Sequence, residues 1–537
     1  MTQIARSAHV DTFTRDNLPP RETWPEFLFT LPELQYPAAL NCAAELLDRR
    51  VEAGNGDNRC LVTDTETWTY NDLLAKSNQV ARALVDEMGL VPGNRVLLRG
   101  PNNPWLVAGW FGVIKAGGVA VATMPLLRTH ELETMIEIAG VTMAICDHRF
   151  MQDLDAAAPD GFQIFAYGGP DPDDLTKVAA KKRSTFKSVG TAADDVCMLA
   201  FTSGTTGKPK ATMHFHRDVL AIADTFSRHL LQPAPTDLFA ASPPLAFTFG
   251  LGQSVVFPLR AGAAVYLLEQ PSPARLLEAV ERHGITVLAT APTAYRAMVP
   301  ELSAARVRSL RACVSAGETL PEATWHAVHD ACGIRIIDGI GSTEMLHIFI
   351  SAAGQDIRPG ATGRAVPGYV AEVQDPDGRP VADGELGRLA VKGPTGCRYL
   401  RGDRQATYVR DGWNITGDVY ARDGNGYFRY QARADDMIIS AGYNIAGPEV
   451  EEALLRHPAV AEAAVVGAPD EERGMIVKAV VVLRPDADLG PEPARTLQDF
   501  VKGQIAPYKY PRAIEFASEL PRTATGKLQR FRLREGS

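Results

Sequence analysis

The segment PWLVAGWFGVIKAGGVAVATMPLL, residues 104–127, is apolar over most of its length. It is long enough to suggest a helix that crosses a membrane. Lys115 at its centre and the Gly117-Gly118 pair argue against such a helix, because a bilayer disfavours charge and paired glycines break helices. We therefore predict a buried helix that runs into a buried strand, and no membrane partner.

Helix and strand signals alternate on both sides of this segment. Residues 70–88 have the apolar spacing of a helix, and RVLLRG at 95–100 is typical of a short buried strand. Two further pairs follow, HELETMIEIAG (130–140) before VTMAICD (141–147), and SPARLLEAVERHG (272–284) before ITVLATAP (285–292). Helices that alternate with short apolar strands predict an α/β protein with largely parallel sheets.

A smaller second domain is expected at the C-terminal end. Gly- and Asp-rich turns at 375–393 indicate a shorter β region, and the chain starts a new series of elements after RADDMIIS. The new series comprises a helix at 448–458, strands at 460–468 and 475–484, and a helix near 495–505. We place a boundary near Asp435, which gives an N-terminal domain of residues 1–434 and a C-terminal domain of residues 435–537.

Composition excludes several classes of protein. The chain has 537 residues, 45% hydrophobic and 22% charged, which is typical of a soluble globular protein. Its formal net charge of −9 argues against a nucleic-acid partner, because phosphate backbones select for excess Lys and Arg. The seven cysteines are scattered without CxxC spacing, so we expect reduced thiols and no metal site. The N-terminal residues have no apolar core typical of a signal peptide, and we expect a cytoplasmic protein.

The stretch FTSGTTGKPKATMHF (201–215) has the features of a phosphate-binding loop. An apolar strand precedes a glycine-rich turn whose N–H groups and hydroxyls can converge on an anion. It is not a Walker motif, because two residues separate Gly204 from Gly207 and Pro209 follows Lys208. A surface loop without a ligand is the alternative interpretation of this stretch taken alone.

Five motifs in order decide between these interpretations. They are FTSGTTGKPK (201–210), GIGSTEM (339–345), NITGDVYARDGNGYF (414–428), RADDMIISAGYNIAGPEVE (433–451) and PRTATGKLQR (521–530). Together they resemble the acyl-adenylate-forming superfamily of acyl-CoA synthetases, peptide-synthetase adenylation domains and luciferases. The resemblance covers nearly the whole chain. It implies a large multi-subdomain N-terminal domain and a small mobile C-terminal cap.

The resemblance implies a reaction in two steps. A carboxylate attacks the α-phosphorus of ATP to give acyl-AMP and pyrophosphate, and a thiol then displaces AMP to give a thioester. Negative charge builds on the phosphates in the first step, so the site must supply cations and N–H donors. By the resemblance, Thr343 contacts the α-phosphate and Glu344 binds Mg²⁺. The β and γ phosphates would be held by Thr202, Ser203, Gly204, Thr205, Thr206, Gly207 and Lys208.

The same resemblance assigns the nucleoside contacts. Asp418 matches the acid that binds the ribose hydroxyls, and Arg433 would be a second ribose or phosphate contact. Asp338 stands where the family reads the adenine amino group. The other residues implied at the nucleotide are Gly317, Glu318, Gly339 and Ile340. Two positions depart from the family pattern: Ile340 replaces the usual aromatic residue, and Ala432 stands before Arg433 in place of the usual glycine.

The C-terminal domain carries the remaining implied roles. Lys527 matches the lysine that bridges the acyl carboxylate and the α-phosphate, although a solvated lysine in a basic tail is the alternative. Asp435 matches the hinge about which the cap turns between the two steps. Gly442 would leave room for the pantetheine arm of coenzyme A. The cofactors implied are ATP, Mg²⁺ and coenzyme A.

The acid that is activated is expected to be aromatic. SPPLAFTFGLG (242–252), VSAGETL (314–320) and DGIGSTEMLHIF (338–349) resemble the aryl-CoA ligase branch, and among these the 2-aminobenzoate and benzoate CoA ligases. Phe247 and Phe249 beside Gly250 could wall a slot for a flat ring, although aromatic pairs at alternate positions also occur in strand cores. His347 and Thr248 would face an ortho substituent. The other substrate residues implied are Ala316, Gly341 and Ile348.

Several alternatives stay open at the level of sequence. The preferred acid could be benzoate in place of 2-aminobenzoate. The acceptor could be the phosphopantetheine of a carrier protein in place of coenzyme A. A catalytically silent nucleotide-binding sensor is a third possibility, which the presence of Lys527 and Glu344 disfavours. The sequence does not choose between a monomer and a homodimer.

Overall fold

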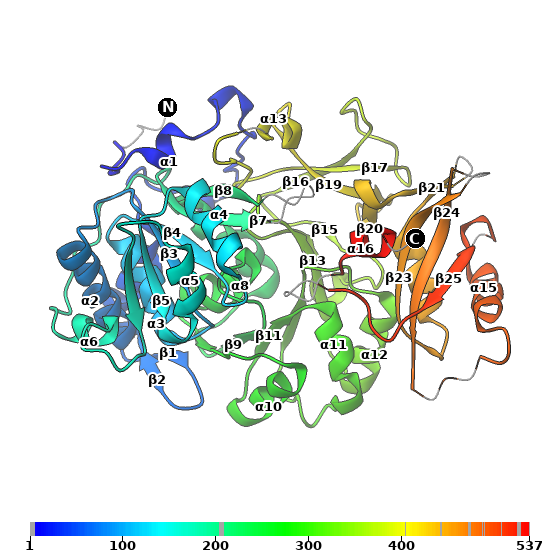
Figure 1. Ribbon diagram of the computed structural model, residues 1–537, viewed down its shortest axis with the longest axis horizontal. Helices are drawn as coiled ribbons and strands as arrows, with labels where there is room; N and C mark the ends of the chain where they lie inside the picture. Colours follow the sequence, from blue (N-terminus) through cyan, green and yellow to red (C-terminus); the bar gives the residue numbers. More distant parts are fainter. Residues whose placement is uncertain are drawn as a thin grey trace.

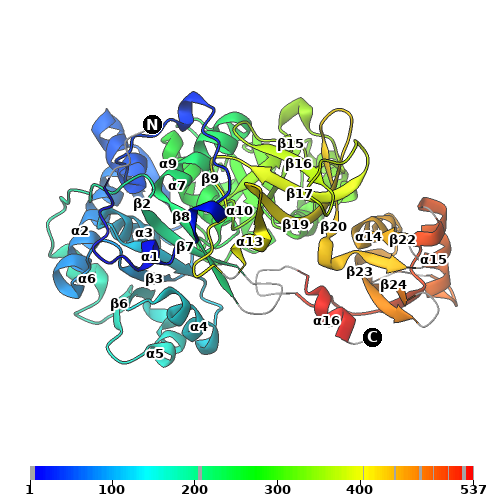
Figure 2. The ribbon, with the colours of Figure 1, turned by 90° about the horizontal axis from the view of Figure 1, so that it is seen from above.

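The computed structural model describes residues 6–202, 209–402, 404–440, 443–470, 474–485, 487, 489–505, 507–522 and 528–535. It is a mixed α/β protein with three sheets in a large N-terminal part and two small sheets in a C-terminal part. The C-terminal part, drawn orange to red, lies at one end of the long axis of the molecule (Figure 1). The view from above shows it beside β20 (Phe428–Arg433) and away from the first sheet (Figure 2).

The first sheet has six strands in the order β6-β5-β3-β4-β7-β8. All pairs are parallel except β7 and β8, which form an antiparallel hairpin at one edge. The strands are β3 (Arg95–Arg99), β4 (Val119–Thr123), β5 (Met143–Asp147), β6 (Gln163–Tyr167), β7 (Val196–Thr202) and β8 (Lys210–Phe215). The helices around them are α1 (Phe13–Asp16), α2 (Tyr70–Met88), α3 (Pro104–Lys115), α4 (Thr129–Ala139), α5 (Met151–Ala157), α6 (Leu175–Ala180) and α7 (His216–Ile222).

The apolar segment at 104–127 divides as the sequence predicts. Helix α3 ends at Lys115, Gly117 has φ +76°, and β4 follows. Lys115 is buried and forms an ion pair with Asp48. Burial lowers the pKa of Lys115, which the adjacent carboxylate offsets in part. Within the described residues, none of the helices has both the length and the apolar character that a membrane span requires.

The second sheet has nine strands in the order β15-β14-β13-β12-β11-β9-β10-β1-β2. Its six central strands, from β13 to β1, are parallel, and the strands at both edges are antiparallel. The strands are β1 (Arg59–Val62), β2 (Thr67–Thr69), β9 (Leu238–Ala241), β10 (Ala264–Tyr266), β11 (Val287–Thr290), β12 (Ala312–Ser315), β13 (Ile336–Gly341), β14 (Ile348–Ser351) and β15 (Arg364–Ala365). The helices of this region are α8 (Thr248–Leu251), α9 (Phe257–Ala261), α10 (Pro273–His283), α11 (Pro292–Met298) and α12 (Glu322–Cys332).

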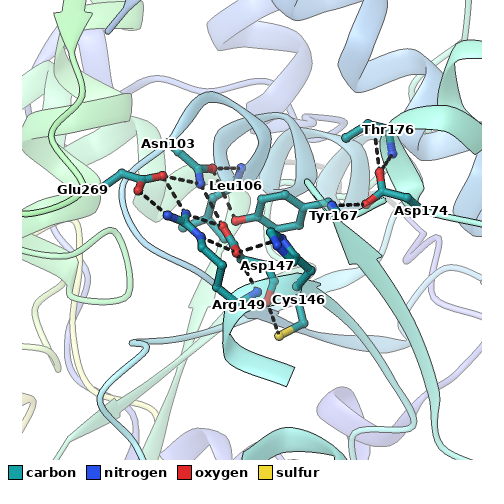
Figure 3. A network of polar contacts seen from close by, with 11 residues as sticks. Asn103, Leu106, Cys146, Asp147, Arg149, Tyr167, Asp174, Thr176 and Glu269 are labelled. Atoms are coloured by element: carbon teal, nitrogen blue, oxygen red, sulfur yellow. Dashed lines mark hydrogen bonds and ion pairs between the residues drawn. The ribbon is translucent and has the colours of Figure 1, made fainter. Parts of the chain in front are cut away.

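A polar network joins these two sheets where their strands end (Figure 3). Arg149, just after β5, donates to Asp147 at 2.7 and 2.9 Å and to Glu269 at 2.8 Å. Asn103 at the start of α3 also donates to Glu269, at 3.1 Å. The network lines a cavity of about 860 Å³. None of the site residues chosen from the sequence lines this cavity. The cavity therefore lies between the two sheets and is separate from the candidate site.

Two thiols that are far apart in the sequence meet in the core. Cys42, Cys197 and His216 are buried, with one ligand-type atom of each within 4.8 Å of the others. The Nδ1 atom of His216 lies 3.3 Å from the Cys42 sulfur. All seven cysteines are free. The spacing of the cysteines along the sequence gave no sign of this meeting, because the chain fold alone brings these residues together.

The third sheet is antiparallel and completes the N-terminal part. Its strands run in the order β16-β17-β19-β18, with β20 paired to β19. They are β16 (Val370–Gln374), β17 (Leu386–Lys392), β18 (Val409–Arg410), β19 (Trp413–Arg422) and β20, and the short helix α13 (Gln405–Tyr408) precedes β18. This sheet is the β region that the Gly- and Asp-rich turns indicate.

The C-terminal part has its own hydrophobic core, which gathers around Ile438, Val450, Val477 and Leu497. Its two sheets are β21-β22 and β23-β24-β25. The elements are β21 (Ile438–Ser440), β22 (Tyr443–Ile445), α14 (Gly447–Leu455), β23 (Val460–Asp470), β24 (Gly474–Leu483), α15 (Pro493–Gln504), β25 (Ala513–Phe516) and α16 (Arg530–Glu535). Helix α14 packs against α12 and β20, so this part contacts the N-terminal part along one side. The exact division at residue 435 stays a prediction.

Candidate active site

The candidate site lies where β12 and β13 end. These strands are parallel neighbours in the nine-stranded sheet, with Ser315 beside Asp338. Strand β14 then returns antiparallel to β13, so residues 342–347 form the turn between them. In parallel sheets, ligands bind at the carboxyl ends of the strands. The GIGSTEM motif therefore occupies the expected edge.

Asp338 holds a carboxyl group at this edge. Its backbone carbonyl accepts a hydrogen bond from the Ser351 hydroxyl at 2.5 Å, which fixes the end of β13 against β14. The side-chain Oδ1 atom is buried and has no hydrogen-bond partner among the described residues. Burial raises the pKa of Asp338 to about 7. A buried acceptor of this kind is available to a donor on a ligand.

The glycines of the motif are explained by the return of β14. A Cβ atom on Gly339 would lie 2.7 Å from the Cγ2 atom of Ile348. A Cβ atom on Gly341 would lie 2.6 Å from the backbone oxygen of His347. No real Cβ atom is accommodated at such distances. Both glycines thus allow β14 to pack closely against β13. Ile340 on β13 and Ile348 on β14 lie at this same edge of the sheet.

Glu344 lies in the turn between β13 and β14. The turn is closed by the Leu346 N–H, which donates to the Thr343 carbonyl at 3.2 Å, and Leu346 has φ +68°. Glu344 is 9% exposed, and its Oε1 atom accepts a hydrogen bond from the Tyr399 hydroxyl at 2.7 Å. A carboxylate held in this way retains lone pairs for a cation. Sequence reasoning missed Tyr399, since its surroundings match no motif.

The phosphate-loop motif is carried by the β7–β8 hairpin, in which Thr202 lies opposite Lys210. The chain after the motif is a strand and not a P-loop helix, in agreement with Pro209. The ammonium of Lys210 lies 5.9 Å from the centre of the Tyr399 ring, so this hairpin borders Glu344. Thr202 is half-buried. The other predicted loop residues, Ser203, Gly204, Thr205, Thr206, Gly207 and Lys208, lie outside the described residues.

Asp418 and Arg433 form an ion pair on neighbouring strands. They are opposite each other in the β19–β20 register, and Arg433 donates to Asp418 Oδ1 at 3.0 Å. Asp418 is 8% exposed. Burial raises the pKa of Asp418, an effect that the charge of Arg433 opposes. The strand pairing explains why an acid and an arginine that are fifteen positions apart meet here.

His347 occupies an aromatic pocket. Its ring centre lies 5.5 Å from that of Phe226, 5.6 Å from Phe249 and 4.5 Å from Phe257. Both ring nitrogens are buried, and neither has a hydrogen-bond partner within the described part of the chain. Burial lowers the pKa of His347 to about 3, so the imidazole is neutral at physiological pH. Sequence reasoning missed Phe226 and Phe257.

The predicted aryl residues at 247–250 lie at the start of helix α8, so the alternative of a strand core is wrong. Gly250 lies directly against the carbonyl groups of Pro243 and Pro244, where a Cβ atom would clash. Thr248 is 9% exposed, and Phe247 and Phe249 are half-buried. Phe249 meets His347, whereas no ring contact joins Phe247 to this pocket within the described residues.

The remaining predicted residues lie around these groups. Ala316 is buried after β12, and Gly317 has φ +91°, a conformation that favours glycine. Glu318 is half-buried and faces the C-terminal part of the chain. The backbone of Asp435 belongs to a short 3₁₀ helix, Ala434–Asp436, directly after β20. Gly442 and Lys527 lie outside the described residues.

Comparisons with known proteins identify the family of this chain. Residues 47–399 match the family described as AMP-binding enzyme, and residues 449–527 match its C-terminal domain. The chain belongs to this family. Within it, the chain is 36% identical over 514 residues to the benzoate–CoA ligase of Thauera aromatica, covering 94% of this chain and 98% of that protein.

Two solved structures place this AMP-binding enzyme in the aryl-CoA ligase branch of the adenylate-forming superfamily. The anthranilate CoA ligase AuaEII, solved with anthranoyl-AMP, has a TM-score of 0.89 and 33% identity over 94% of this chain and 99% of that one. A benzoate CoA ligase from Burkholderia xenovorans LB400 has a TM-score of 0.85 and 33% identity over 92% of this chain and 100% of that one. The protein is accordingly an AMP-forming acid–thiol ligase, whose family uses ATP and coenzyme A and is usually associated with Mg²⁺.

Proposed function

We propose that this ligase activates 2-aminobenzoate, forming aryl-AMP and pyrophosphate from ATP and then the coenzyme A thioester. The observation that carries the choice of acid is His347, a buried neutral imidazole among three aromatic rings whose nitrogens have no partner in the described part of the chain. The resemblance in fold to an anthranilate CoA ligase supports the same choice, because anthranilate is 2-aminobenzoate.

Two carboxylates would bind the nucleoside on the nucleotide side of the site. The unpartnered Oδ1 atom of Asp338 would accept from the adenine amino group, and Asp418 would accept from the ribose hydroxyls. Arg433 donates to the Oδ1 atom of Asp418, and within the described residues no hydrogen bond to the Oδ2 atom is seen, so that atom could accept from a hydroxyl. The phosphates would be held by Thr202, Thr343 and residues 203–208.

Glu344 has the chemistry expected of a Mg²⁺ ligand. It is a hard oxygen donor and nearly buried, and its Oε1 atom accepts a hydrogen bond from Tyr399. Mg²⁺ in such sites is bound by one or two carboxylates together with substrate phosphates. The ion would neutralise charge on the departing pyrophosphate, and Tyr399 would hold the carboxylate in place.

The aryl side of the site would recognise an ortho amino group through a hydrogen bond. The aromatic ring of the acid would lie beside Phe249, with Gly341, Ala316 and Ile348 as the other proposed contacts. The amino group would donate to an imidazole nitrogen of His347 or to the Thr248 hydroxyl. Benzoate would leave that acceptor unpaired in a buried place, which costs about 1 to 3 kcal/mol. The expected preference is therefore about 5- to 150-fold.

The test is a competition assay. The protein is incubated with ATP, Mg²⁺, coenzyme A and equal amounts of 2-aminobenzoate, benzoate, 2-hydroxybenzoate, 3-hydroxybenzoate and a medium-chain fatty acid, and the thioesters are quantified by mass spectrometry. We expect 2-aminobenzoyl-CoA to dominate. A dominant benzoyl-CoA product would instead support benzoate as the substrate, and aryl-AMP without a thioester would indicate a carrier protein as the acceptor.

Variants at the acceptor sharpen this test. Thr248→Ala and His347→Ala should each bring the ratio of 2-aminobenzoate to benzoate turnover closer to one if the replaced side chain binds the amino group. The matched control is His326→Ala, which removes an exposed histidine of α12. If neither Thr248→Ala nor His347→Ala changes the ratio, the assignment of the ortho contact is wrong.

The proposed second step needs the C-terminal domain to move. Residues 435–537 would form the cap, with Asp435 as its hinge, and would present Lys527 for adenylation and the region of Gly442 for thioester formation. No histidine base is required in the second step, because a thiol with a pKa near 8.5 is already partly ionised at neutral pH.

A further inference from the structure

Four charged side chains form a chain across the interface between the two parts of the molecule. Arg296 on α11 and Glu318 after β12 belong to the N-terminal part, and Glu462 on β23 and Arg522 belong to the C-terminal part. The separation of the charged atoms is 3.5 Å for Arg296–Glu462, 2.6 Å for Arg522–Glu462 and 3.5 Å for Arg522–Glu318. In Figure 1, α11 and α12 lie next to the C-terminal part.

The signs of the charges alternate along this chain. Glu462 lies between two arginines, and Arg522 lies between two carboxylates. The four side chains are only 18–31% exposed, so water screens them less than it screens a fully exposed pair. Two of the three ion pairs join the N-terminal to the C-terminal part. Separating the two parts would break both of these pairs at once.

Arg522 also marks the start of the segment that carries Lys527. Arg522 and Leu528 face each other in an antiparallel bridge, and the Gln529 N–H donates to the Pro521 carbonyl at 2.9 Å. These contacts bring together the two flanks of residues 523–527. Glu318 forms its ion pair with Arg522 from the N-terminal part, and it follows Gly317, a residue proposed to lie at the nucleotide. The ion pairs therefore anchor the flanks of that segment to the candidate active site.

We propose that Arg296, Glu462 and Arg522 are positioning residues for the adenylation step, holding the cap in the orientation in which the described flanks of residues 523–527 lie against Glu318. The inference rests on the proposed two-step function. The two ion pairs that join the parts, Arg296–Glu462 and Arg522–Glu318, must break before the cap turns for thioester formation. Removing one of the charges should therefore slow the first step and leave the second step unchanged or faster.

The test measures the two half-reactions separately. Aryl-AMP formation is followed by pyrophosphate release without coenzyme A, and thioester formation is followed from supplied aryl-AMP and coenzyme A. Glu462→Gln and Arg296→Gln change opposite sides of one ion pair and keep the approximate side-chain size. Each is expected to slow aryl-AMP formation by about two- to fivefold. The double variant should lose about as much as Glu462→Gln alone, because Arg296 acts through its pair with Glu462.

The matched control is Asp499→Asn, which breaks the Asp499–Lys502 ion pair within α15, on the side of the same domain that lies away from the N-terminal part (Figure 1). It should leave both half-reactions unchanged. Raising the salt concentration should slow aryl-AMP formation by the wild type more than by Glu462→Gln, because salt weakens the pair that the variant lacks. The melting temperatures of the variants separate this effect from a general loss of stability.

Two results would overturn the proposal. One is an equal loss in both half-reactions, and the other is wild-type rates in both variants. Failure of the proposed substrate is a different result, since the wild type would then release pyrophosphate with another acid from the competition mixture. The half-reaction comparison is made with whichever acid is active, so it tests the ion pairs independently of the preferred acid.

Discussion

The two sides of the candidate site differ in how their polar groups are satisfied. On the proposed nucleotide side, Asp418 is paired with Arg433 and Glu344 is held by Tyr399. The Oδ1 atom of Asp338 is the exception on this side, because it has no partner among the described residues. On the aryl side, His347 is surrounded by aromatic rings, and its nitrogens have no partner in the described part of the chain. Paired groups are positioned before the ligand arrives, whereas an unpaired buried group favours the ligand that satisfies it. The nucleotide side is therefore suited to one ligand, and the aryl side to selection among similar acids.

The largest expected effect concerns Lys527, which we assign to the adenylation step alone. Lys527→Ala should slow aryl-AMP formation at least about 100-fold, because a positioned charge that stabilises a transition state is lost. Thioester formation from supplied aryl-AMP should be retained. The two rates are measured with pyrophosphate release and with mass spectrometry of the thioester. Equal losses in both steps would contradict an assignment of the lysine to one step.

The next effect tests the paired groups of the nucleotide side. Asp418→Asn keeps the shape of the side chain but removes the charge that pairs with Arg433. We expect kcat/KM for ATP to fall by about 10- to 100-fold, because hydrogen bonds to a charged group contribute about 1.5 to 3 kcal/mol. The KM for the aromatic acid should change little, since this pair lies on the nucleotide side.

The control for this prediction is Asp383→Asn, which removes the exposed Asp383–Arg422 ion pair of the same β region. It should leave kcat/KM for ATP unchanged. If Asp418→Asn behaved like this control, Asp418 would not be a ribose contact, and the contrast between the two sides of the site would lose its support.

The smallest expected effect is a pH dependence at Asp338. Its pKa of about 7 means that the carboxyl group gains charge as the pH rises from 6 to 8. The charged form accepts a hydrogen bond from the adenine amino group more strongly, so the KM for ATP should fall by a few-fold over this range. Asp338→Asn should remove that part of the pH dependence. Dividing the KM of the wild type by the KM of Asp338→Asn at each pH removes the contribution of the ionisation of ATP itself.

The same group gives a stability prediction with a defined sign. Its pKa is raised from 3.8 in the unfolded chain to about 7 in the fold, so the folded protein binds more protons between these values. The contribution of Asp338 to the free energy of unfolding is therefore fully present below pH 3.8 and is lost as the pH rises toward 7. The free energy of unfolding, measured with urea at pH 5 and at pH 8, should differ less between these two pH values for Asp338→Asn than for the wild type. An unchanged difference would contradict the raised pKa.

Local signals account for much of the fold. Residues 70–88, for example, are predicted as a helix and form α2 with the same bounds, because Thr69 and Asp72 cap its start and Gly89 ends it with φ +67°. The alternation of helices and strands, the break at Gly117 and the later β region also follow from neighbouring residues. Such features depend on sequence spacing, which is visible without the structure.

Contacts between distant residues account for what sequence analysis missed. Phe226 and Phe257 reach His347 from separate elements, and Tyr399 reaches Glu344 from a segment without a motif. The meeting of Cys42 with Cys197 is of the same kind. Spacing cannot reveal such contacts, because they depend on how the sheets pack. The motifs pointed to Glu344 and His347, whereas their neighbours Tyr399, Phe226 and Phe257 required the structure.

The turn that joins β13 to β14 has a consequence for altering this enzyme. Asp338, Glu344 and His347 lie within ten consecutive residues and depend on the close strand return at Gly339 and Gly341. An insertion or exchange of this turn to admit a new acid would also displace the groups proposed to bind adenine and Mg²⁺. Helix α8 carries Thr248 and Phe249 on a separate segment. A library that varies α8 while preserving the turn should therefore yield more active enzymes with altered acid preference than a library that varies the turn.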